Sequence, residues 1–140
     1  MSVRLKAALT ALITVLLITF ACLAFMPWRM DSVVTEIGDI QKCVILCYES
    51  GTYTCAYPEE ETLDRLTEKL SVTTGHFDRK RSEFSYPAGK PLYRVYFWDS
   101  EGRIPDLWIC DTALSYDEAQ FVLDDAAAAS LNEILASCFE

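Results

Sequence analysis

The chain has 140 residues and a formal net charge of −9, and all 21 acidic residues follow position 30. The part of the chain beyond that position is therefore strongly acidic. Such a surface argues against binding to nucleic acid, which needs clustered Lys and Arg, and against adhesion to anionic lipid. The length is typical of one folded domain.

The first element in chain order is an uncharged, apolar run from Ala7 to Met26. About twenty helical residues, each rising about 1.5 Å, match the thickness of the hydrocarbon core, so the run predicts a transmembrane helix. We expect residues 1–29 to form an anchor that contacts membrane lipid through residues 7–28. Residues 30–140 are expected to form a single soluble, acidic α+β domain.

Two alternatives remain open for this segment, a cleaved signal peptide and lipidation at Cys22. Signal peptides usually have a shorter apolar core that is followed by a small-x-small cleavage site. The core here is longer, and no clean cleavage site follows it. The residues before Cys22 also depart from the usual lipoprotein pattern. Arg4 and Lys6 precede the segment and Arg29 follows it, a bias that favours a cytoplasmic N-terminus and an extracytoplasmic domain.

The next expected elements are two strands and a helix. The apolar run from Cys43 to Tyr48 predicts a strand, and residues 53–57 predict a second strand after a turn around Gly51. Pro58 suits the first turn of a helix, where its missing N–H costs nothing. The apolar stripe of that helix consists of Leu63, Leu66 and Leu70.

Residues 71–91 have no sustained hydrophobic period and predict a long loop, with a possible short strand near His76. The loop contains a basic run at residues 79–81. That run is interpreted as a local counter-charge in an acidic domain, and the alternative is a small docking loop.

Two more strands and a second helix are expected in the last third of the chain. Residues 92–98 form the strongest strand pattern, and residues 107–110 predict a fourth strand. Ser115 then resembles a helix cap, with Glu118 completing a capping box, and the helix is expected to run to about Ser137. Its expected apolar face is Leu123, Ala127, Leu131, Ile134 and Cys138.

The predicted order after the anchor is therefore β-β-α-β-β-α. Two hairpins, each followed by a helix, suggest one four-stranded antiparallel sheet with both helices on one face.

The cysteines offer one candidate for redox chemistry. A three-residue turn at residues 50–52 would place Cys47 opposite Cys55, where an outside domain could form a disulfide. The alternative register pairs Cys47 with Thr54 and separates the two sulfurs. All five cysteines of the soluble part could instead be small buried hydrophobic residues.

The aromatic strand at residues 92–98 offers a candidate partner surface. Period-two alternation puts Arg94, Tyr96 and Trp98 on one face of that strand. The first strand is apolar on both faces, so its Tyr48 joins this possible surface. Two helices cover only one face of such a sheet, and an exposed apolar face marks an interaction site. The alternative is that the loop at residues 71–91 folds over it.

The sequence contains no catalytic, cofactor-binding or metal-binding signature. The lone histidine, His76, has no evident nucleophile or orienting partner, and no Cys-x-x-Cys pair suggests zinc or thiol redox chemistry. We therefore expect a single-pass, membrane-anchored, extracytoplasmic module that binds a protein partner or senses the envelope, without catalysis. The alternative is a small accessory subunit of a larger membrane complex.

Overall fold

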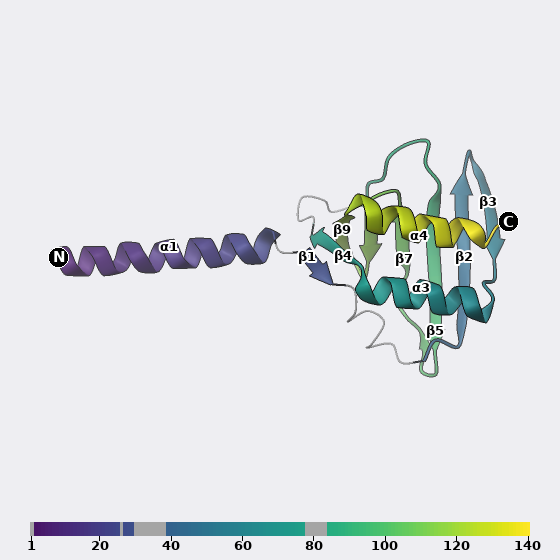
Figure 1. Ribbon diagram of the computed structural model, residues 1–140, viewed down its shortest axis with the longest axis horizontal. Coiled ribbons are helices and arrows are strands. Elements are labelled where there is room, and N and C mark those ends of the chain that lie inside the picture. The colour runs from purple at the N-terminus through teal and green to yellow at the C-terminus, as the bar shows by residue number, and fades with distance from the viewer. Residues whose placement is uncertain (1, 26, 30–38, 78–83) are drawn as a thin grey trace.

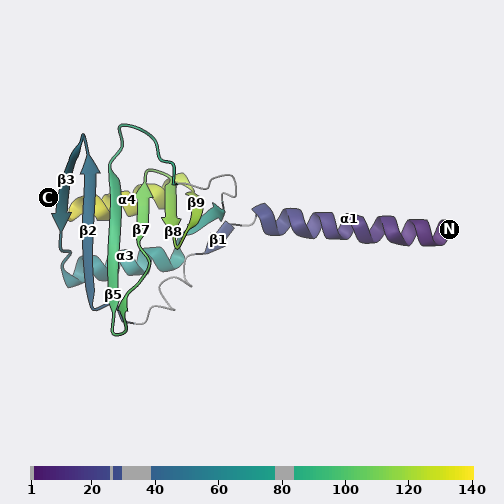
Figure 2. The same ribbon diagram turned by 180° about the vertical axis from the view of Figure 1, so that it is seen from behind.

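The computed structural model describes residues 2–25, 27–29, 39–77 and 84–140. These residues form an N-terminal helix, α1 (Val3–Phe25), followed by one antiparallel sheet and two further helices, α3 (Glu60–Val72) and α4 (Asp125–Ser137). Both later helices lie on the same face of the sheet, as Figures 1 and 2 show from opposite sides. The basic run at residues 79–81 lies outside the described residues.

The sheet has nine strands in the described part of the chain, and each strand pairs antiparallel with its neighbours. Eight of them follow the order β1-β4-β9-β8-β7-β5-β2-β3, and β6 pairs only with β5. The strands are β1 (Pro27–Arg29), β2 (Lys42–Glu49), β3 (Thr52–Ala56), β4 (Thr74–Phe77), β5 (Leu92–Asp99), β6 (Gly102–Arg103), β7 (Leu107–Cys110), β8 (Ala113–Tyr116) and β9 (Ala119–Leu123).

Helix α1 is the one described helix that is long and apolar enough to cross a membrane, and a signal sequence would have the same properties. Its three threonines are satisfied within the helix. The hydroxyl of Thr10 donates to the carbonyl of Lys6 at 3.0 Å, and Thr14 and Thr19 make equivalent bonds of 2.9 Å. No polar side chain of the central part of α1 therefore needs a partner outside the helix.

The sheet begins almost where α1 ends. Helix α1 ends at Phe25, and Pro27 already starts β1, which pairs with β4 along the edge of the sheet. Residues 27–29, which the sequence assigned to the anchor, thus belong to the sheet. The α+β domain consequently sits directly against the end of α1 (Figure 1).

The core lies between the sheet and the two later helices. Leu66 and Leu70 from α3 and Leu131 from α4 are almost fully buried against Ile45 and Val95 of the sheet. The stripe predicted for the first soluble helix is thus confirmed, with Leu63 partly buried at its end.

The fold class is confirmed in outline, but the four-stranded sheet is wrong. All four expected strands are present as β2, β3, β5 and β7, and the possible strand near His76 is β4. The largest error concerns residues 115–123, which were expected to begin the last helix and instead lie in the β8–β9 hairpin.

The turn of this hairpin explains the error. Asp117 and Glu118 have φ values of 46° and 66°, which match a two-residue turn with a left-handed backbone. Neither residue is glycine, so the usual hairpin signal is missing. The real cap of α4 is Asp124, whose Oδ1 accepts a 2.8 Å hydrogen bond from the backbone N–H of Ala127.

The packing of α4 gives a direct test of this core. Leu131→Ala should lower the free energy of unfolding by about 2–5 kcal/mol, because it opens a cavity at a fully buried position. The matched control on the same helix is Glu133→Ala, at an exposed position, which should change stability by at most about 0.5 kcal/mol. Guanidinium unfolding of the full chain in detergent, followed by tryptophan fluorescence, measures both. Equal effects would mean that α4 does not pack through Leu131.

Candidate binding face

The side of the sheet away from α3 and α4 carries a set of large side chains. Odd-numbered residues of β2 and β5, such as Ile45, Val95 and Phe97, are buried beneath the helices. The alternate residues therefore lie on the other face, here called the open face. Its central residues are Lys42, Val44, Leu46 and Tyr48 on β2, Arg94, Tyr96 and Trp98 on β5, and Trp108 on β7.

The strand register brings these side chains into contact rows. Arg94 pairs with Leu46 on one side and with Trp108 on the other, so an arginine lies at the centre of the row. Tyr96 pairs with Val44 in the next row. All these residues except Lys42 are only partly exposed, in large part because neighbouring large side chains cover one another.

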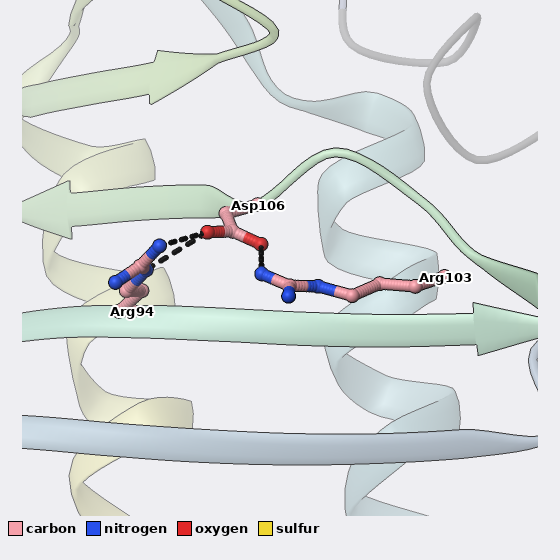
Figure 3. A network of polar contacts seen from close by, with 3 residues as sticks. All are labelled: Arg94, Arg103 and Asp106. Atoms are coloured by element: carbon pink, nitrogen blue, oxygen red, sulfur yellow. Dashed lines mark hydrogen bonds and ion pairs between the residues drawn. The ribbon is translucent and has the colours of Figure 1, made fainter.

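A carboxylate next to β7 holds two arginines over this face (Figure 3). The guanidinium Nε of Arg94 donates to Asp106 Oδ2 at 2.8 Å, and its Nη2 contacts the same oxygen. Arg103 donates from Nη2 to Asp106 Oδ1. Because Asp106 bridges the two arginines, their positions depend on one side chain.

The arginines stack on the aromatic rings. Arg94 lies over Tyr96, with its Cζ 4.8 Å from the ring centroid, and over Trp108, at 4.4 Å. Arg103 also lies over Tyr96, at 4.4 Å. Such cation–π contacts contribute roughly 0.5–1 kcal/mol at exposed sites. The result is a layered arrangement in which the cations and rings contact one another.

The pKa of Asp106 reflects this arrangement. Burial acts to raise the pKa, but the hydrogen bonds from Arg103 and Arg94, together with their positive charges, outweigh it and hold the pKa below its ordinary value. Asp106 is thus a carboxylate throughout the physiological range, which keeps the two arginines in place.

Residues 84–91 cover one part of the open face. The ring of Phe84 lies 6.1 Å from that of Trp108, and the sulfur of the buried Cys110 lies 3.9 Å from the backbone oxygens of Pro87 and Lys90. The alternative prediction, that the long loop covers this face, therefore holds over β7 within the described residues. Around Tyr96 the contacts come from Arg94 and Arg103, and Tyr96 stays partly exposed.

The four predicted surface residues all lie on the open face. Arg94, Tyr96 and Trp98 are neighbours on β5, and the ring centroids of Tyr96 and Trp98 lie 6.2 Å apart. Tyr48 lies further along, where its ring stacks at 4.6 Å on that of Tyr53. The sequence reasoning missed Trp108, Arg103 and Asp106, as well as Lys42, whose Nζ lies 5.0 Å from the Trp98 ring centroid. Alternation along residues 107–110 could have found Trp108, whereas no pattern marks the other missed positions.

The expected register of the first hairpin is wrong. Its loop contains two residues, Ser50 and Gly51, with φ values of 52° and 80°, rather than three. Cys47 consequently pairs with Thr54, and Cys55 pairs with Leu46. Cys47 is buried on the helix side and Cys55 is exposed on the opposite side. The disulfide expected between them does not fit this register, because their sulfurs point to different faces.

The other cysteines on the helix side behave as buried hydrophobic groups. Burial, with a smaller contribution from Cys138, raises the pKa of Cys43 to about 12. Burial also raises the pKa of Cys47 and that of Cys138. Since the thiolate is the reactive form, these thiols are poor nucleophiles.

The described residues contain no cluster of metal-binding side chains. No group of three or more His, Cys, Asp or Glu side chains in this part of the chain could hold a metal ion. His76 is exposed on β4, near the α1 end of the sheet, opposite Val122. The open face is therefore the feature with the strongest claim to function.

The Asp106 bridge gives a test with a defined pH dependence. Asp106→Asn should lower the free energy of unfolding by about 1 kcal/mol at pH 7, since it weakens charged hydrogen bonds to partly exposed arginines. Because the folded-state pKa lies below the unfolded value of about 3.9, this advantage is complete above that pH and is lost as pH falls through the folded pKa.

Urea unfolding of the full chain in detergent, measured between pH 2 and pH 7, compares the two proteins. The difference in free energy of unfolding between the unchanged protein and Asp106→Asn should be constant at neutral pH and should vanish at the acid end. The control variant Glu133→Gln, on the exposed side of α4, should show no such difference. A gap that persists unchanged to pH 2 would contradict the charged bridge.

The comparisons with known proteins identify no relative. No protein-family model matches the chain, and neither the curated proteins nor the solved structures contain a significant match. The function is therefore inferred from the open face and from the way the domain is attached to α1.

Proposed function

We propose that this protein is a single-pass, membrane-anchored binding module, with its domain outside the cytoplasm and its open face as the contact surface for a protein partner. The observation that carries the proposal is the ordered array of Arg94, Tyr96, Trp98 and Trp108 on a face that no described helix covers. Aromatic residues and arginine are the types most enriched at the energetic centres of protein interfaces.

The preorganised arginines favour binding over a purely structural role. Asp106 and the rings hold the guanidinium groups of Arg94 and Arg103 in place before any partner arrives. A partner that stacks on these groups loses little side-chain entropy on binding. The proposal is for binding without catalysis, with no cofactor and no nucleic acid as ligand.

The attachment of the domain to α1 favours a partner close to the membrane. Only residue 26 separates α1 from β1, so the domain has little freedom to move away from the bilayer if α1 spans it. This feature also supports the alternative, in which the chain is an accessory subunit of a larger membrane complex. The Lys/Arg bias around α1 supports the outside placement of the domain.

A photo-crosslinking residue placed at Tyr96 tests the proposal in intact cells. The aromatic probe p-benzoylphenylalanine should give a discrete crosslinked adduct from the open face, whereas the same probe at Glu133 on α4 should not. Mass spectrometry of the adduct identifies the partner and its compartment. No adduct from position 96, or the same adducts from both positions, would refute the open face as a contact surface. A cytoplasmic partner would contradict the outside placement.

A further inference from the structure

The distal edge of the sheet has an unused row of backbone hydrogen-bonding groups. Strand β3 is the last strand in the sheet order, and no described strand pairs with its outer side. Because the turn has two residues, Glu49 and Thr52 form a hydrogen-bonded pair. Hydrogen-bonded and non-hydrogen-bonded pairs alternate along an antiparallel hairpin, so the backbone groups of Thr54 also point toward β2. The N–H and C=O groups of Tyr53 and Cys55 must then point outward, away from the sheet.

The two edges of the sheet differ in how they are protected against pairing. At the α1 end, the edge strand β1 has three residues and includes Pro27 and Arg29, which are features that block strand addition. Strand β3, at the other end, contains no proline and no charged residue between Thr52 and Ala56. Its Tyr53 side chain is 70% exposed, so an incoming strand would meet an open, uncharged edge.

The chain segments that flank β3 are strongly acidic. Between Lys42 and Arg65 the chain contains no Lys or Arg, whereas exposed carboxylates stand on both sides of β3. These carboxylates are Glu49 before the strand, and Glu59, Glu60, Glu61 and Asp64 after it. A strand added here would be stabilised by basic residues beyond its ends, because charges of opposite sign attract over about one Debye length.

We propose that β3 is a strand-addition site for an extended, basic segment of a partner protein. The backbone groups of Tyr53 and Cys55 would supply the hydrogen bonds, and the flanking carboxylates would select lysine or arginine near the ends of the segment. This site is separate from the centre of the open face, and it stands whether or not the open face binds a partner.

A second copy of the chain fits this edge less well. A second copy would bring its own five carboxylates against those of the first, and these like charges would repel each other. In addition, α1 leaves the sheet at the end opposite β3 (Figure 1). A twofold pairing through β3 would therefore point the two α1 helices in opposite directions, which is incompatible with anchoring both in one membrane.

Amide hydrogen exchange of the full chain in lipid nanodiscs tests the site residue by residue. The probe is a synthetic peptide of alternating threonine and valine with two lysines at each end. At saturation it should slow exchange at the Tyr53 and Cys55 amides by about tenfold or more and leave the already bonded Thr54 amide unchanged. The same peptide with glutamates in place of lysines should give no protection.

Two variants at one position separate strand addition from a side-chain effect. Cys55→Pro removes an outward N–H without removing a bond to β2, and it should abolish peptide protection at Tyr53. Cys55→Ser keeps the N–H and should retain that protection. Protection of the Thr54 amide in both variants verifies that the hairpin is intact. If the proline variant loses this protection, Cys55→Ser and the two peptides still decide the question.

Three results would overturn the proposal. They are the absence of protection by the lysine peptide, equal protection by both peptides, and protection of Tyr53 and Cys55 that rises with protein concentration without any peptide. The last result would assign the edge to a second copy. Loss of the crosslink at position 96 would not affect this outcome, so the two proposals fail independently.

Discussion

Helices α3 and α4 cover only one face of a wide sheet, and the rest of the structure depends on this imbalance. On the covered face, Ile45 and Val95 pack against Leu66 and Leu131, and a conventional apolar core results. The other face has no second layer of helices within the described residues, and its own side chains must shield one another. Stacked arginines and aromatic rings achieve this, since the methylene and planar surfaces of arginine cover rings while the charge stays hydrated.

Under the proposed function, the same arrangement would serve both stability and recognition. Asp106 is drawn into the network by two arginines, and Arg94 lies against both Tyr96 and Trp108. Under the proposed function, a partner would meet side chains that these contacts already hold in place. The sheet also spans roughly 34 Å from β1 to β3, given about 4.8 Å between strands, and this places the uncharged β3 edge at the end farthest from α1.

Much of this fold could be predicted from the sequence wherever a pattern was strong. The alternation along residues 92–98 correctly separated Tyr96 from Val95, and the stripe of Leu66 and Leu70 correctly set the buried face of α3. The β8–β9 hairpin could not be recognised, because Ser115 and Glu118 imitate a capping box and the turn has no glycine. In that case long-range pairing of the strands overrides the local signal.

The candidate site was predicted in part for a similar reason. Strand alternation identifies which residues share a face, and it placed Arg94 and Trp98 together with Tyr96. It gives no information on loop residues such as Asp106, which reaches the network only because the turn after β6 returns the chain to β5. The one-residue difference in turn length that separates Cys47 from Cys55 is likewise set by the backbone of Ser50 and Gly51, and a cysteine spacing cannot reveal it.

The central claim is that the open face is accessible in the chain alone, and solvent paramagnetic relaxation measures this most directly. A soluble gadolinium chelate added to the full chain in nanodiscs relaxes methyl groups according to their distance from solvent. We expect strong relaxation for the methyl groups of Val44 and Leu46, which lie on the open face. We expect little relaxation for the methyl groups of Ile45 and Val95, which are paired on neighbouring strands and buried on the helix side. Equal protection of both sets would contradict the account, because the open face would then be covered within the protein itself.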